Sequence, residues 1–156
     1  MKKIFLSIIM VLFVSLTAMA DDKSDALKFF NNYVNDANNY KDSVTALYAP
    51  NAKIIRQVVK PDGGLVDVYT DSATYTKQMK IAQAGARLRQ YKNYYSNVTV
   101  TQLAKGKCKI SSLRQPAGET YKLKTYMVIQ KQPNGKWIIV EELMQTKQQI
   151  FLRYAK

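Results

Sequence analysis

Histidine is absent from this 156-residue sequence, and cysteine occurs once, at Cys108. Without histidine, no Ser-His or Cys-His nucleophile pair can form, and the commonest metal ligand is missing. We therefore expect no metal site, and the lack of a P-loop or glycine-rich dinucleotide turn predicts no cofactor. One cysteine excludes an intramolecular disulfide, so the fold must rest on its core. Alternation with Ile110 predicts that Cys108 is a buried, inert thiol.

The first twenty residues, MKKIFLSIIMVLFVSLTAMA, have the three parts of a secretory signal peptide. Two lysines begin the segment, residues 4–16 are apolar, and Ala-Met-Ala ends it with a small-x-small cleavage site. The stretch from Ile4 to Ala20 has 17 residues, the lower limit for a membrane span, and the cleavage site followed at once by DDKSD favours cleavage over an anchor. We predict a cleaved signal peptide at 1–20, a single domain at 21–156 and no transmembrane span after cleavage. The predicted location is the periplasm of a Gram-negative cell, or otherwise the medium.

Basic residues outnumber acidic ones by 24 to 11, and the sequence pI is about 9.8. Without the two lysines of the predicted signal peptide, 22 basic residues face 11 acidic ones, a formal charge of +11. This charge favours an anionic surface or polymer as partner, including lipid head groups, acidic polysaccharide or an acidic protein. The alternative is that the lysines only keep an exported protein soluble. Nucleic acid is not an expected partner, because an exported protein rarely meets it.

Three helices are predicted in the N-terminal half. Apolar residues recur at helical spacing over 24–40 and again over 70–91. A shorter helix, which includes Tyr48, is predicted over 41–50 and ends at Pro50. In the third helix, Thr70 or Asp71 is the expected N-cap.

The third predicted helix contains a glycine and a cationic face. Gly85 lowers helix propensity by about 1 kcal/mol relative to alanine, and we attribute it to a close packing contact. Lys77, Lys80 and Arg87 lie away from the apolar stripe and form a candidate anion-binding surface.

Strands dominate the rest of the chain. A Pro-Asp-Gly-Gly turn at 61–64 predicts a short hairpin before the third helix. From Tyr94 onward, two turns predict four more strands: Ala104-Lys105-Gly106 and Pro133-Asn134-Gly135, whose Asn-Gly is a strong hairpin signal. The tail, 146–156, fits either an extension of the last strand or a short amphipathic helix.

The last predicted strand, GKWIIVEELM, contains two adjacent carboxylates. Strand side chains alternate between the two faces of a sheet. Alternation puts Glu141 on the face of Trp137 and Ile139, together with Leu143, and puts Glu142 on the opposite face. The two carboxylates therefore cannot share a proton, and Glu141 is predicted to be the one that faces the interior.

This order of elements resembles the nuclear transport factor 2-like superfamily, also described as SnoaL-like or cystatin-like. ALYAPNAKII resembles the step into its first strand, and GKWIIVEEL resembles its last strand. The resemblance covers roughly residues 22–145. It implies an α+β fold in which three helices pack on a strongly curved, mainly antiparallel sheet and enclose a pocket. It also makes a homodimer an expected assembly.

The resemblance implies which residues line that pocket. The candidate ligand-binding residues are Tyr33, Tyr48, Trp137, Ile139, Glu141 and Leu143. A carboxyl group beside an indole in partly apolar surroundings has a raised pKa, which suits a general acid or base. Glu141 is thus the one weak candidate for a catalytic residue, and the alternative is that it only pairs with a basic or tyrosine side chain.

We therefore predict an exported, non-enzymatic binding or assembly protein of the cell envelope. It would hold a small or lipid-like ligand in a Trp/Tyr-lined pocket, or bind an envelope protein through the outer sheet face. One alternative is an isomerase or dehydratase that uses Glu141 and a tyrosine. A second alternative is a scaffold subunit of an envelope or secretion complex.

Overall fold

The computed structural model describes residues 21–155. The signal peptide predicted at 1–20 lies outside the described residues. Within residues 21–155, no helix combines the length and the apolar character that crossing a bilayer requires.

The helices lie in the order that the sequence predicts. An N-terminal helix covers residues 21–38, the 3-10 helix η1 covers Asp42–Leu47, and α2 covers Ser72–Leu88. Asp71 caps α2 by accepting a hydrogen bond from the Thr74 backbone N–H at 2.8 Å, as expected of an N-cap aspartate.

The second helix is shorter than predicted. η1 ends at Leu47 and has no side-chain cap, and Tyr48 already belongs to strand β1. Pro50 lies inside that strand, at an exposed position where its missing N–H is tolerated. The prediction that Tyr48 is helical was wrong because Pro50 limits the helix earlier than expected.

Six strands form one sheet in the order β2-β1-β6-β5-β4-β3. β1 and β6 are parallel, and every other neighbouring pair is antiparallel. The strands are β1 Tyr48–Val59, β2 Leu65–Thr70, β3 Asn93–Ala104, β4 Lys107–Pro116, β5 Leu123–Lys131 and β6 Trp137–Thr146.

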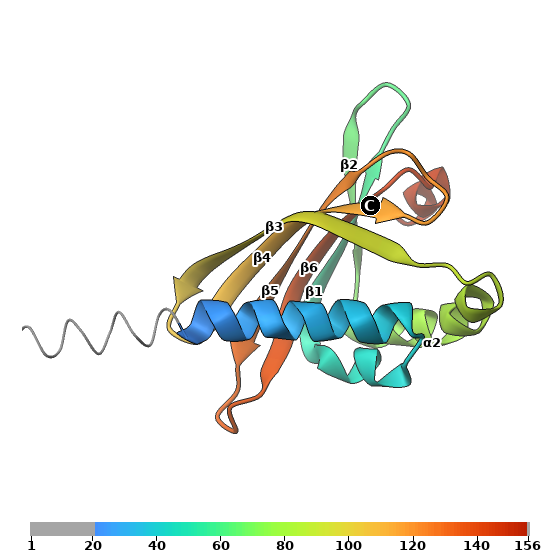
Figure 1. The fold of residues 1–156 in the computed structure, drawn as a ribbon. Coiled ribbons are helices and arrows are strands. Elements are labelled where there is room, and N and C mark those ends of the chain that lie inside the picture. The colour runs from blue at the N-terminus through green and yellow to red at the C-terminus, as the bar shows by residue number, and fades with distance from the viewer. Residues whose placement is uncertain (1–20, 156) are drawn as a thin grey trace, which may run out of the picture.

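Figure 1 shows the helices on one side of the curved sheet, with the N-terminal helix crossing below the strands. The core fills the space between the two layers, where apolar helix residues such as Ala26 and Phe30 meet strand residues such as Ile110 and Ile129. The predicted α+β fold with a curved, mainly antiparallel sheet is confirmed.

A bulge in β6 changes which side chains face the helices. Ile139 pairs with Ile129 and Glu141 pairs with Val128, so Val140 is an extra residue with no partner of its own on β5. An inserted residue reverses the inward–outward alternation beyond it. Ile139 and Glu142 are therefore both directed inward, although three positions separate them.

The tail forms a short 3-10 helix, η2, over Gln149–Tyr154. It contacts β1 and β2, and the Gln149 side-chain amide donates to the Val59 carbonyl at 2.9 Å. Of the two possibilities that the sequence left open, the helix is the one observed.

Gly85 has no close packing partner. A methyl group built at its Cα would meet only the Arg89 guanidinium, at 3.6 Å, an ordinary contact distance. The packing explanation predicted for this glycine was wrong, because this part of α2 lies at the surface.

Candidate functional site in the interior of the fold

Glu142 is a carboxylate buried between the sheet and the helices, with 1% of its surface exposed. Tyr48 donates a short hydrogen bond from its hydroxyl to Oε2. Oε1 accepts from the Arg56 guanidinium at 3.0 Å and from the Tyr75 hydroxyl at 3.2 Å. Both oxygens are therefore occupied by protein donors, as a buried charge requires.

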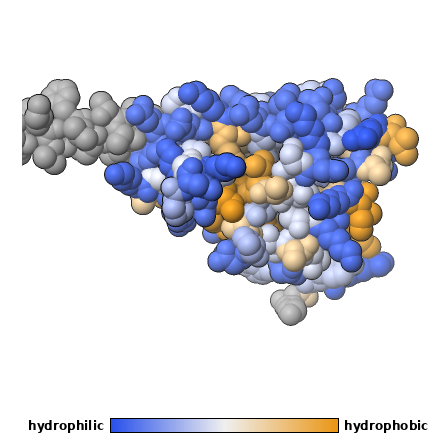
Figure 2. Space-filling view, turned by 90° about the horizontal axis from the view of Figure 1, so that it is seen from below, coloured by the Kyte–Doolittle hydropathy of each residue, from blue (hydrophilic) through white to orange (hydrophobic). Residues whose placement is uncertain are grey.

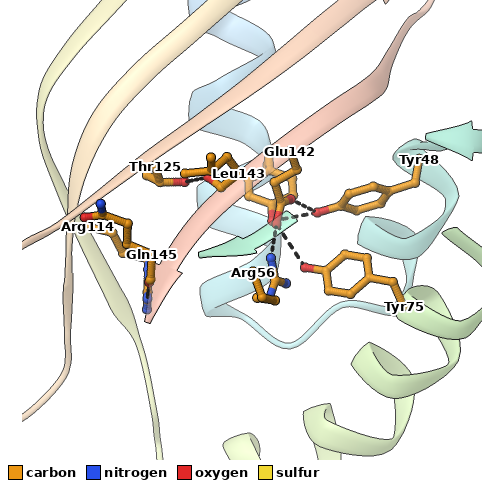
Figure 3. A network of polar contacts seen from close by, with 9 residues as sticks. Tyr48, Arg56, Tyr75, Arg114, Thr125, Glu142, Leu143 and Gln145 are labelled. Atoms are coloured by element: carbon orange, nitrogen blue, oxygen red, sulfur yellow. Dashed lines mark hydrogen bonds and ion pairs between the residues drawn. The ribbon is translucent and has the colours of Figure 1, made fainter. Parts of the chain in front are cut away.

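Three elements supply these side chains, as Figure 3 shows. β1 contributes Tyr48 and Arg56, α2 contributes Tyr75, and β6 contributes Glu142. The N-terminal helix adds Tyr33, whose hydroxyl lies 3.1 Å from the Tyr48 hydroxyl. We call these five residues the Glu142 network.

Packing also orients the members of the network. The Arg56 guanidinium lies over the Tyr75 ring, 4.5 Å from its centroid, a cation–π geometry. The rings of Tyr48 and Tyr75 meet edge to face at 5.2 Å. The network is thus held by ring packing as well as by hydrogen bonds.

The tyrosine hydroxyls stay protonated at neutral pH. Burial, followed by the charge of Glu142, raises the pKa of Tyr33 and Tyr48 well above the usual value. Burial raises the pKa of Tyr75 to about 12, although the nearby Arg56 charge acts in the opposite direction. All three hydroxyls therefore keep their protons and can donate hydrogen bonds at neutral pH.

A small cavity lies beside Glu142, with a volume of about 10 Å³. This is room for about one water molecule. Its lining includes Tyr33, Tyr95, Ser112 and Met127. A substrate of several atoms does not fit there without movement of the helices or the sheet.

Glu141 lies on the other face of the sheet. Its Oε1 accepts a hydrogen bond from the Tyr126 hydroxyl at 2.5 Å, and the Lys109 ammonium lies 3.9 Å from the centroid of the Tyr126 ring. The prediction that Glu141 faces the interior and Glu142 the outside was wrong, because the bulge at Val140 exchanges their faces. The tyrosine partner of Glu141 is thus an outer-face residue.

The other predicted pocket residues separate into two groups. Tyr33, Tyr48 and Ile139 are buried in the interior. Trp137 is half-buried at the start of β6, and the centroid of its ring lies 5.3 Å from the Lys131 ammonium. It does not line the cavity beside Glu142. Leu143 lies on the outer face beside Tyr126. Their binding of a ligand stays a prediction, but they do not form one pocket.

The candidate anion-binding residues Lys77, Lys80 and Arg87 are all exposed on α2. The Arg87 guanidinium donates to the Tyr40 carbonyl at 3.0 Å. Binding of an anion by these residues also stays a prediction.

The sequence did not identify Arg56 or Tyr75 as site residues, and alternation assigned Glu142 to the wrong face of the sheet. Arg56 stands among apolar strand residues, where a charged residue facing inward is a detectable but ambiguous signal. Glu142 carries no such signal, since its inward direction depends on the bulge. Within residues 21–155, no group of three or more potential metal-ligating side chains gathers.

A second buried cation lies further along the sheet. Arg114 is 6% exposed and donates to the Asn93 side-chain oxygen and the Gln145 carbonyl, each at 2.8 Å. Thr125 donates to the Leu143 carbonyl nearby, at 2.9 Å. These bonds connect β3, β4, β5 and β6 at the end of the sheet, so they fix strand positions around the site.

No protein-family model matches the chain, and neither does any curated protein. Solved structures do match it. A protein of unknown function from the DUF3225 family of Pectobacterium atrosepticum is 20% identical, with a TM-score of 0.61, over 81% of this chain and 91% of that one.

Two further structures show the same architecture. A domain of unknown function with a cystatin-like fold from Nostoc punctiforme is 14% identical, with a TM-score of 0.56, over 85% of this chain and 84% of that one. A putative scytalone dehydratase from Novosphingobium aromaticivorans is 12% identical, with a TM-score of 0.55, over 83% and 86%. The chain therefore has the nuclear transport factor 2-like fold that its sequence resembles. At these identities the likeness concerns the fold and leaves the function open.

Proposed function

We propose that this protein is a binding or assembly module of the cell envelope that acts through its surface. The observation that carries the proposal is the closure of the interior around Glu142. Its two oxygens already accept hydrogen bonds from Tyr48, Arg56 and Tyr75, and the adjacent cavity measures about 10 Å³. In such a site the carboxylate stabilises the fold and has no vacant position for a reacting molecule.

The charge of the chain supports a surface role. The formal charge of +13 over the whole sequence favours contact with anionic partners. Figure 2 shows hydrophilic side chains over most of the helical face, around an apolar area near its centre. A surface of this kind suits an envelope protein that meets an anionic partner, and export to that compartment belongs to the same proposal.

The first test asks whether function depends on the interior network around Glu142 or on the surface of the protein. In the source organism, the gene is replaced by a Tyr75→Phe variant, which keeps the ring but removes the hydroxyl beside Glu142. We expect this variant to complement a deletion strain, that is, to return it to the wild-type phenotype. Thermal unfolding must show that the variant is folded at growth temperature. Failure of a folded Tyr75→Phe protein to restore the phenotype would contradict the proposal.

A fractionation experiment tests the location. Osmotic shock followed by a high-salt wash, which weakens contacts with anionic surfaces, should release a C-terminally tagged protein together with other exported proteins. Retention of the protein with cytoplasmic markers would contradict an envelope role, whatever the result of the Tyr75→Phe exchange.

A second candidate function is a dehydratase- or isomerase-type enzyme. It is favoured by the convergence of three tyrosine hydroxyls and one guanidinium on the network around Glu142, and by the fold shared with a putative scytalone dehydratase. Catalysis would require the helices to open, because the present cavity is too small. If so, Tyr75→Phe abolishes function while leaving the protein folded, which is the opposite of the expected result.

A further inference from the structure

The outward face of α2 exposes aliphatic side chains. Leu88 is 86% exposed and Ile81 is 70% exposed, with Ala84 between them at helical spacing. The opposite side of the helix packs inward through Tyr75 and Met79. Exposed leucine and isoleucine on a helix that already has a buried face are not needed for the core.

Cations flank these aliphatic residues, and no carboxylate accompanies them. Lys77 and Lys80 are exposed about one turn or less from Ile81, and the exposed Arg87 precedes Leu88 and donates a hydrogen bond to the Tyr40 carbonyl. None of these three forms an ion pair with any of residues 21–155. Indeed, no acidic residue occurs in the sequence between Asp71 and Glu119. The outward face of α2, with its cations and aliphatic side chains, is the surface on which the inference rests.

Two kinds of occupant fit this surface poorly. A second copy of the chain would bring its own cations against it, and like charges repel. A highly charged polymer would pair with the cations but leave Ile81 and Leu88 in water. The partner of this surface must provide negative charges for the cations and an apolar region in which Ile81 and Leu88 can be buried.

We infer that α2 binds the surface of an anionic lipid bilayer. Ile81 and Leu88 lie about 10 Å apart along the helix axis, so a helix parallel to the membrane inserts both side chains together. Lysine and arginine at the edges of such a helix extend their alkyl stems and keep their charges at the phosphate groups. The lipid head groups supply the negative charge, and the acyl region accepts the aliphatic side chains.

This inference names a partner within the proposed function and rests on it, since both place the activity at the surface. The two fail separately. Loss of vesicle binding refutes the membrane contact alone, whereas the Tyr75→Phe exchange tests the interior and does not involve lipid.

The test is co-sedimentation of the purified protein with vesicles of phosphatidylcholine, either alone or mixed with phosphatidylglycerol. We expect binding to the mixed vesicles only, and we expect it to weaken steeply as salt rises. The Lys77→Gln/Lys80→Gln variant should bind roughly twenty-fivefold more weakly, because each lost cation weakens binding about fivefold. Ile81→Ser/Leu88→Ser should bind on the order of tenfold more weakly.

Matched controls use exposed residues elsewhere. Lys105→Gln/Lys136→Gln removes the same charge, and Leu65→Ser/Leu103→Ser removes side chains that are 53% and 51% exposed. Both controls should bind like the unchanged protein. Equal binding to uncharged vesicles, no binding to the mixed ones, or equal losses in the controls would overturn the inference.

Soluble polyglutamate provides the last comparison. If the lipid surface is the partner, polyglutamate competes only weakly with vesicles, and the aliphatic variant loses vesicle binding. Strong competition by polyglutamate, together with an aliphatic variant that binds normally, would assign the surface to an acidic protein or polymer and overturn the membrane contact.

Discussion

Glu142 shows how a charged side chain is kept inside an apolar core. It is 1% exposed, yet four polar groups compensate for the lost water: two tyrosine hydroxyls, a guanidinium and, through Tyr48, the hydroxyl of Tyr33. Replacing one member of such a network leaves its partners buried without compensation. The network therefore acts as one unit, and each residue in it depends on the others.

The exchange Glu142→Gln should destabilise the protein strongly. It keeps the side-chain volume but leaves the Arg56 charge buried, so we expect the free energy of unfolding to fall by about 3 kcal/mol or more. Urea unfolding followed by circular dichroism measures this. Glu141→Gln, on the outer face, is the matched control and should lose well under half as much. Equal losses of unfolding free energy in the two variants would show that the Glu142 network stabilises the fold no more than the outer-face contact of Glu141 does.

The raised pKa of the Tyr75 hydroxyl predicts that the folded protein loses stability at alkaline pH. Its pKa is about 12 in the folded protein, whereas an unfolded tyrosine ionises near pH 10. A raised folded-state pKa means that its contribution to stability is complete below pH 10 and is lost as pH rises from about 10 toward about 12. Urea unfolding across this range should show the decline, and Tyr75→Phe should make it shallower. An unchanged slope in Tyr75→Phe would mean that the hydroxyl is not buried in solution.

At the scale of elements, the bulge at Val140 determines the site. It puts Glu142 beside β1 and α2 and puts Glu141 beside Tyr126. A second irregularity lies in β3, where Asn97 has φ +53 and the register shifts between Ser96 and Thr99. Bulges bend strands and increase their twist, which suits a sheet that curves around helices.

Helix α2 can be made more stable at Gly85. A methyl group there meets only the Arg89 guanidinium at 3.6 Å, so Gly85→Ala should raise the free energy of unfolding by about 0.5–1 kcal/mol. Thermal and urea unfolding measure the gain. Gly106→Ala is the contrasting variant: at φ +66, with Lys131 Cβ at 3.3 Å, it should lower stability. A loss in Gly85→Ala would mean that α2 packs against something in solution.

For the whole molecule, Cys108 reports on global opening. The thiol is completely buried, burial raises its pKa, and it lies in the core. Reaction with Ellman's reagent should therefore be slow and should accelerate with urea in step with unfolding. Thr101→Cys, at an exposed position on the neighbouring strand, should react rapidly without urea. Rapid reaction of Cys108 in the native protein would contradict a tightly closed core.

The sequence by itself determined the class and order of the elements. Helical spacing, the Asp71 cap and the turns at 61–64 and 133–135 are local signals, because each depends on residues close together in the chain. They were enough to predict an α+β class and the order of its elements, while the nuclear transport factor 2-like fold came from the resemblance of ALYAPNAKII and GKWIIVEEL.

Only the tertiary structure decided which carboxylate faces inward. In GKWIIVEELM, strict alternation selects Glu141, and nothing in these ten residues marks Val140 as the extra one. The bulge lies where β6 pairs with β5 on one side and with β1 on the other, and the register shifts against both strands at this point. These pairings join residues far apart in the sequence, as do the contacts of Glu142 with Tyr48, Arg56 and Tyr75.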